Sequence, residues 1–197
     1  MKNKLGTLCM VLGTVLIVAA LSLFLWNRRE ADQAAEAAET ILPRVVEQIA
    51  VTAAEAPAPP DPFDPAMTET EIDGYLYIGY LSIPALGLEL PVMSDWDYTR
   101  LTIAPCRYSG STKTDDLVIA AHNYARHFGG LSGLSGGEEV YFVDMDNVVS
   151  SYTVVCVEIL SPTAVEEMTN GDYDLSLFTC TYGGRSRVTV RCDRAEG

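Results

Sequence analysis

The feature that most constrains this chain is a run of 22 uncharged residues near its N-terminus, from Leu5 to Trp26. As an α-helix with a rise of about 1.5 Å per residue, this run is roughly 33 Å long, enough to cross a hydrocarbon core of about 30 Å. Basic residues flank it on both sides, and Trp26 stands where an interfacial aromatic residue belongs. We therefore expect residues 1–29 to be a membrane anchor.

The orientation of this segment is set by weaker signals. Because basic residues lie on both sides, the positive-inside rule does not decide it. We favour an N-terminus inside the cell and a single-pass protein of the cell membrane, with the rest of the chain extracellular. A cleaved signal peptide is the alternative, but the apolar run exceeds the usual h-region of about 7–15 residues, and no small-x-small site follows it closely.

The rest of the chain is strongly acidic. The full sequence has 13 basic and 27 acidic residues, a net charge of −14, and leaving out the four basic residues of the anchor region changes this to −18. Such a surface argues against nucleic-acid binding, because neutralising phosphates requires basic side chains. Five cysteines in 197 residues are also too few for a disulfide-dense mini-domain.

Residues 30–68 have the composition of a helical and Pro-rich stalk and linker. The first part is rich in Ala and Glu with apolar residues near helical spacing, but Pro43 interrupts it, so we expect a broken helix. The stretch Ala54–Pro65 reads AEAPAPPDPFDP and favours an extended spacer. This leaves residues 69–197 as one globular domain.

The globular part alternates short apolar runs with turn residues, which is typical of small barrels and sandwiches. About seven strands in a domain of this size predict a mainly β fold, a small closed or nearly closed barrel. Short helices are expected at Asp95–Leu101 and Thr163–Met168, and a hairpin turn at Met145–Asn147. The strand candidates are Tyr75–Ile83, Leu88–Val92, Asp116–Ala121, Glu139–Met145, Ser151–Leu160, Asp174–Cys180 and Arg187–Cys192.

Candidate reactive residues stand at two strand ends. His122, one of only two histidines, directly follows the apolar run LVIAA, whereas His127 lies in the loop beyond. Cys180 ends another strand and begins a polar turn that contains Arg185 and leads to Arg187. Cationic neighbours favour the thiolate, and an arginine can hold the oxyanion of a tetrahedral intermediate.

Other site types fit poorly. The sequence has no CxxC pair and no HExxH, GxGxxG, Walker A or GxSxG motif, so we expect no metal and no cofactor. Cys156 lies among valines and is expected to be buried. If two of the cysteines form a disulfide outside the cell, Cys106–Cys192 is the first candidate pair among the alternative connectivities.

Taken together, these residues resemble the sortase family, the membrane-anchored cysteine transpeptidases of Gram-positive cell surfaces. Sortases carry a strand ending in TLxTC and an arginine at the start of the next strand; here Leu175–Cys180 reads LSLFTC and Arg187 opens RVTVRC. The family's histidine follows a strand, as in the Ala120–Asn123 stretch AAHN. LSLFTC departs from TLxTC at its first positions but keeps Thr-Cys. The His-Asn-Tyr loop and the compact Cys–Arg turn are closer to the class B- or D-like groups.

The resemblance implies a closed sortase-like β-barrel with short helices and assigns roles to particular residues. Cys180 would be the nucleophile, His122 the general acid/base, and Arg187 the group that binds the substrate and stabilises the oxyanion. Arg185 is the rival for the arginine role. Residues of the 102–105 loop and the 161–170 segment would line a substrate groove. Further substrate-binding candidates are Thr179, Arg185 and Asn123.

The resemblance also implies a reaction. Cys180 would attack the Thr–Gly carbonyl of an LPxTG-like sorting signal on a surface protein or pilin, and His122 would protonate the leaving amine. An amine from a cell-wall precursor or a pilin lysine would then resolve the acyl-enzyme. Asp61-Pro62-Phe63 is similar to the Asp-Pro-aromatic lid of pilin-assembling sortases, although a plain Pro-rich linker is the simpler interpretation.

Two other functions remain open at this point. The first is another extracellular cysteine peptidase or acyltransferase, such as an L,D-transpeptidase, although the Ser-x-Gly-Cys setting of that family is absent here. The second is a non-enzymatic, membrane-tethered β-barrel that serves as an interaction module. In that case Cys180, His122 and Arg187 would have no joint role.

Overall fold

The computed structural model describes residues 2–54 and 65–195. The described residues form a long N-terminal helix, α1 (Lys2–Ala54), and nine strands. The Asp61–Phe63 segment, considered above as a lid, lies outside the described residues. The strands are β1 (Thr70–Ile72), β2 (Tyr75–Ile83), β3 (Leu88–Met93), β4 (Cys106–Ser109), β5 (Leu117–Ala120), β6 (Glu139–Asp144), β7 (Val149–Leu160), β8 (Leu175–Cys180) and β9 (Arg187–Arg194).

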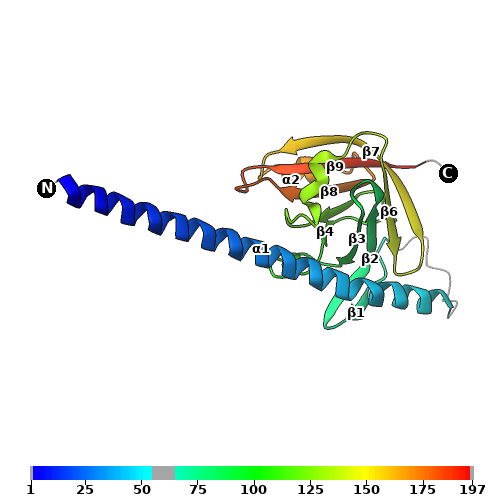
Figure 1. The fold of residues 1–197 in the computed structure, drawn as a ribbon. Coiled ribbons are helices and arrows are strands. Elements are labelled where there is room, and N and C mark those ends of the chain that lie inside the picture. The colour runs from blue at the N-terminus through cyan, green and yellow to red at the C-terminus, as the bar shows by residue number, and fades with distance from the viewer. Residues whose placement is uncertain (1, 55–64, 196–197) are drawn as a thin grey trace.

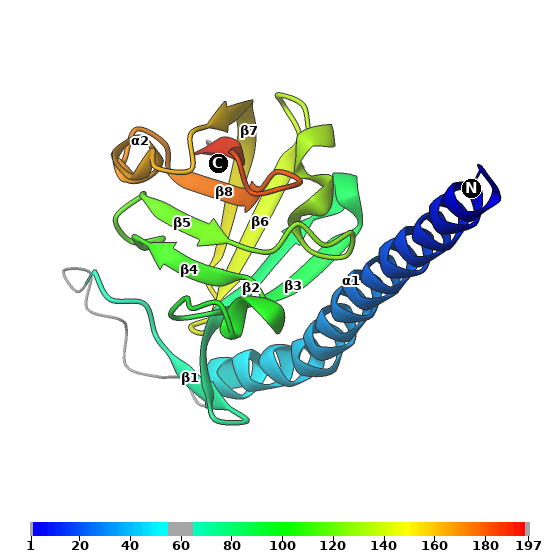
Figure 2. The same cartoon turned by 90° about the vertical axis from the view of Figure 1, so that its left-hand side faces the viewer.

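Eight of these strands close into a barrel in the order β2-β3-β4-β5-β8-β9-β7-β6, with β6 pairing back to β2 (Figures 1 and 2). β1 lies outside this ring and pairs with the beginning of β2. The pairs are antiparallel except for β3–β4 and β5–β8, which are parallel. The predicted closed β-barrel is therefore confirmed, and all seven predicted strands are present.

The sequence does not predict β1 (TEI) or β4 (CRYS), because both are short and mostly polar, whereas the equally short β5 (LVIA) is a continuous apolar run. Short helices occur near both expected places, as η2 (Arg100–Thr102) and α2 (Val165–Thr169), and two more are η1 (Pro84–Leu86) and η3 (Phe128–Gly133). The expected hairpin turn joins β6 to β7. There the Asp144 carboxylate accepts hydrogen bonds from the backbone N–H groups of Asp146 and Val148.

The barrel interior is filled by alternate residues of each strand, since successive side chains of a strand point to opposite faces. Leu117 and Ile119 of β5 and Leu175 and Leu177 of β8 are fully buried in this core. Burying each such side chain contributes about 1.5–3 kcal/mol. The two strands that precede His122 and Cys180 are therefore firmly held.

Helix α1 continues past Pro43, so the expected break in the stalk is wrong. A proline inside a helix removes one backbone hydrogen bond and usually bends it, and Figure 2 shows α1 changing direction between its dark blue and cyan parts. Packing offsets the lost bond, because a stripe of side chains at helical spacing is buried against the barrel. The stripe consists of Ala34, Ala35, Ala38, Ile41, Val45 and Ile49.

The first part of α1 differs from this packed part. Its large apolar side chains are exposed, and the helix is long and apolar enough to cross a membrane. This finding fits a membrane anchor or a signal sequence. Figure 1 shows this part of the helix extending away from the barrel toward the N-terminus.

The cysteines of the barrel are free thiols, so the suggested Cys106–Cys192 disulfide is wrong. The two residues lie on different sides of the barrel wall. Cys106 belongs to the outer apolar cluster that includes Ile41 and Val45 of α1, whereas Cys192 belongs to the interior core. Cys156, which was expected to be buried, is only half-buried.

Candidate active site

The parallel pairing of β5 with β8 brings His122 and Cys180 to the same end of the barrel. Ala120, the last residue of β5, is the register partner of Phe178 in β8. The Ala121 N–H donates to the Phe178 carbonyl at 3.2 Å, and the buried Thr179 hydroxyl donates to the Ala121 carbonyl at 2.8 Å. The two chain segments are therefore joined where they leave the sheet.

Arg187 reaches the same place from β9. It is the register partner of Cys180 in the antiparallel β8–β9 ladder, so the two residues are neighbours across the strands. Its guanidinium donates to the carbonyl oxygens of Gly184 and Ser186, each at 3.3 Å. Within residues 2–54 and 65–195 it forms no ion pair with a carboxylate.

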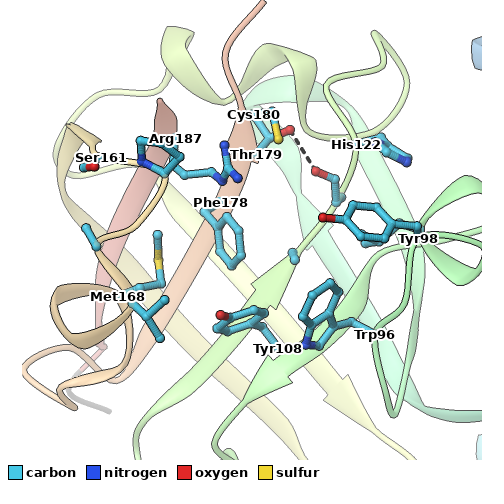
Figure 3. Close-up of a pocket in the computed structure, with 16 residues that line it drawn as sticks. Trp96, Tyr98, Tyr108, His122, Ser161, Met168, Phe178, Thr179, Cys180 and Arg187 are labelled. Carbon is cyan, nitrogen blue, oxygen red and sulfur yellow. Dashed lines mark hydrogen bonds between the residues drawn. The ribbon is translucent and has the colours of Figure 1, made fainter. Parts of the chain in front are cut away.

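These side chains line a cavity of about 250 Å³ (Figure 3). In this view Cys180 lies between Arg187 on one side and His122 on the other. The imidazole of His122 is turned away from the sulfur, and no hydrogen bond joins the two residues in the described part of the chain. The full lining is Trp96, Tyr98, Leu101, Tyr108, Ala120, Ala121, His122, Ser161, Pro162, Ala164, Val165, Met168, Phe178, Thr179, Cys180 and Arg187.

One wall of the cavity is aromatic. The ring of Tyr98 contacts Trp96 with a centroid separation of 6.0 Å, Trp96 contacts Tyr108 at 5.3 Å, and Tyr108 meets Phe178 edge-on at 5.2 Å. Tyr98 is 77% exposed and Trp96 41% exposed, so the wall opens to solvent at its outer end. We call Trp96, Tyr98, Tyr108 and Phe178 the aromatic wall.

The opposite side is formed by α2 and the residues before it, with Val165 and Met168 facing the cavity. Residues of the 161–170 segment therefore line this cavity, whereas residues 102–105 do not, and the role of the cavity as the substrate groove stays a prediction. Sequence reasoning missed the aromatic wall. The available signal was the pair Trp96 and Tyr98 in a loop, where large aromatic side chains are seldom needed for a core.

The titratable groups of this region differ in burial. Burial lowers the pKa of His122, and the Glu30 carboxylate on α1 acts in the opposite direction. The His122 ring also packs on Tyr124, with centroids 4.9 Å apart. Burial raises the pKa of both Cys106 and Cys192 to about 12, which leaves these thiols protonated and unreactive at neutral pH. Cys180 is half-buried and lines the cavity.

Four of the six predicted site residues line one cavity, namely Cys180, His122, Arg187 and Thr179. Arg185 and Asn123 do not line it. Arg185 is exposed in the turn between β8 and β9. Among the described residues, no group of three or more His, Cys, Asp or Glu side chains is placed to hold a metal ion.

Comparison with known proteins finds sortases both among family models and among solved structures. The family described as "Sortase domain" matches residues 81–195. Sortase C1 from Streptococcus suis is 27% identical, with a TM-score of 0.53 over 61% of this chain and 74% of that one. The Group B Streptococcus Pilus Island 1 sortase C2 is 26% identical, with a TM-score of 0.54 over 77% and 97%. A search of curated proteins gave no match.

More distant structures share the fold. The sortase D5 transpeptidase of Clostridium perfringens has a TM-score of 0.62 over 82% of this chain and 99% of that one, at 14% identity. Together with a sortase A from Corynebacterium diphtheriae, the similar structures span classes A, C and D. They do not single out the class B- or D-like groups that the loop residues suggest.

Proposed function

Since the chain belongs to the sortase family of cysteine transpeptidases, we propose that it cleaves an LPxTG-like sorting signal between Thr and Gly and transfers the acyl part to an amine. The observation that supports this most is the meeting of Cys180, His122 and Arg187, from β8, the loop after β5 and β9, around one cavity. A thiol nucleophile, a general acid/base and a cation that can stabilise an oxyanion together suit acyl transfer.

The chemistry follows from these three groups. The Cys180 thiolate attacks the Thr carbonyl carbon, and the Arg187 guanidinium stabilises the negative charge that develops on the carbonyl oxygen. The C–N bond then breaks, and His122 gives its proton to the leaving glycine amine, which leaves a thioester on Cys180. An incoming amine attacks the thioester, His122 accepts its proton, and the new amide is released with the thiolate restored.

His122 must move for this role. Its imidazole is turned away from the sulfur, and poorly aligned catalytic groups are common in the absence of substrate. A rotation about its side-chain bonds brings the ring nitrogen to the leaving amine. Burial lowers the pKa of His122, so its imidazolium is a stronger acid than that of a free histidine, but a smaller fraction of His122 is protonated at neutral pH.

We further propose surface proteins or pilins as substrates and an amine of a cell-wall precursor or a pilin lysine as the acceptor. Residues 1–29 serve as an uncleaved single-pass anchor, and the domain of residues 69–197 acts outside the cell. The continuity of α1 supports this arrangement, because the apolar segment and the stripe buried on the barrel belong to one helix.

The test uses the full chain in detergent with a peptide containing Leu-Pro-x-Thr-Gly and triglycine as the acceptor. We expect cleavage between Thr and Gly, a triglycine adduct of the N-terminal fragment, and a thioester on Cys180 detectable by intact mass. A scrambled peptide is the matched control. Cleavage at another bond, or a product formed without a mass adduct on Cys180, would overturn the proposal.

A further inference from the structure

Arg191, on β9 below the rim, forms a network of polar contacts beside the cavity. Its side chain is only 3% exposed. Nε donates to the Glu158 carboxylate at 2.7 Å, and the terminal nitrogens donate to the Ser176 hydroxyl at 2.8 Å and to the carbonyls of Glu167 and Met168 at 2.5 and 3.3 Å. The guanidinium also lies over the Tyr173 ring, 5.2 Å from its centroid.

Two of these bonds go to α2 itself. Helix α2 has five residues, far fewer than an isolated helix needs to be stable, and no side chain caps its N-terminus. The carbonyls at the end of such a helix have no partner within it. Arg191 supplies donors to both carbonyls, Nη2 to Glu167 and Nη1 to Met168. Nη1 also donates to Ser176 of β8, and Nε donates to Glu158 of β7, so the same side chain is attached to the barrel.

The same helix forms one wall of the cavity. Val165 and Met168 line it, and Figure 3 shows Met168 on the side opposite Trp96 and Tyr98 of the aromatic wall. The distance between these two walls decides which apolar side chains fit between them. Because α2 has little stability of its own, its position depends on what holds it.

We propose that Arg191 is a positioning residue that fixes α2 against the barrel and so sets the apolar binding groove for the sorting-signal peptide. This inference rests on the proposed function and deepens it, since it concerns peptide binding and not the acyl-transfer step. Arg191 does not line the cavity, so it acts on the peptide only through α2.

The chain offers a matched control in Arg194, three residues further along β9. Its guanidinium donates to the Asp115 carboxylate and to the Thr112 carbonyl, both at 2.6 Å, and lies over the Tyr152 ring at 5.3 Å. The network has the same kinds of partner as that of Arg191, but none of these residues lines the cavity. Arg194→Met therefore removes a comparable network without touching the groove.

The experiment compares Arg191→Met, Arg191→Lys and Arg194→Met in the full chain. Two quantities are measured: KM and kcat for the sorting peptide, and hydrogen exchange of the backbone amides of residues 163–170. We expect Arg191→Met to raise KM about tenfold with kcat within about twofold, and to speed exchange in α2. Arg191→Lys, which keeps the charge but cannot reach all partners, should fall between wild type and Arg191→Met.

Equal KM values in Arg191→Met and Arg194→Met would overturn the inference, as would unchanged exchange in residues 163–170. If Arg191→Met does not fold, Ser176→Ala removes one anchoring bond while Arg191 stays, and an unchanged KM and exchange rate in that variant would contradict it. If the wild-type chain cleaves no sorting peptide, the proposed function fails, and the exchange measurement still decides whether Arg191 holds α2.

Discussion

Each end of the β8–β9 ladder has a cysteine and an arginine, but the two ends differ in how these residues are buried and paired. At the rim, Cys180 faces Arg187, and both are half-buried at a cavity. At the far end Cys192 is fully buried, and Arg194 is paired with Asp115. A paired guanidinium is already neutralised and a buried thiol stays protonated, so these groups stabilise the fold, whereas the rim groups remain available to a substrate.

The largest expected effect tests the cysteines of this comparison. Cys180→Ala should abolish transpeptidation because no other thiol lines the cavity, while Cys192→Ala should keep activity and lose about 1 kcal/mol of stability through looser packing. Peptide turnover and urea unfolding of the two variants measure this. Residual turnover in Cys180→Ala would show that the rim thiol is not the nucleophile.

The arginines give the next largest effect. Arg187→Ala should lower kcat/KM by about 10²–10³-fold, the usual cost of losing one oxyanion donor. Arg194→Ala should leave kcat/KM near the wild-type value and lower Tm, because its partners are structural. Steady-state kinetics and thermal unfolding separate the two outcomes. A similar loss of kcat/KM in both variants would erase the contrast between the two ends of the ladder.

The two histidines extend the contrast to pH. His122 is half-buried at the rim, whereas His127 is fully buried, and burial lowers the pKa of His127 to about 4. Below pH 6.5 the unfolded chain binds a proton on His127, and the folded chain does not. The contribution of His127 to the free energy of unfolding is therefore fully present above pH 6.5 and is lost as the pH falls toward 4. The loss approaches about 3 kcal/mol at pH 4.

The measurement is the free energy of unfolding in urea between pH 4 and 8, for wild type and His127→Gln. Subtracting the two free energies of unfolding at each pH cancels the contributions of other titrating groups. One of these is Asp144, whose pKa is raised by burial. We expect the stability curves to converge as pH falls. Parallel curves would show that His127 is accessible to protons in the folded chain.

The sequence predicts which site residues stand at strand ends, but it does not predict which strands are neighbours in the barrel. It placed His122 and Cys180 at strand ends, because apolar runs and turn residues are local signals. It could not show that β5 and β8 are parallel neighbours, which is what brings the two residues to one rim. Arg191 could be assigned to β9, but its partners on β7, β8 and α2 depend on the closed barrel.

The same limit explains the error in the stalk. Pro43 is a valid local signal for a helix break, but the barrel surface that buries Ile41 and Val45 is assembled from strands far along the chain. Packing of an amphipathic face contributes more to helix stability than local propensity does. A signal that is correct for an isolated peptide is therefore overridden in the folded protein.

The smallest expected effect concerns Arg185, the rival arginine of the β8–β9 turn. Arg185 is exposed and does not line the cavity, whereas Arg187 does, although the two are only two residues apart. An exposed cation in a surface turn stabilises a distant charge weakly, because water and salt screen it. Arg185→Ala should therefore change kcat/KM by less than about twofold, and the change should vanish at high salt. A loss as large as that of Arg187→Ala, persisting at high salt, would mean that the turn rearranges on substrate binding and that the oxyanion is held from the turn and not from the strand.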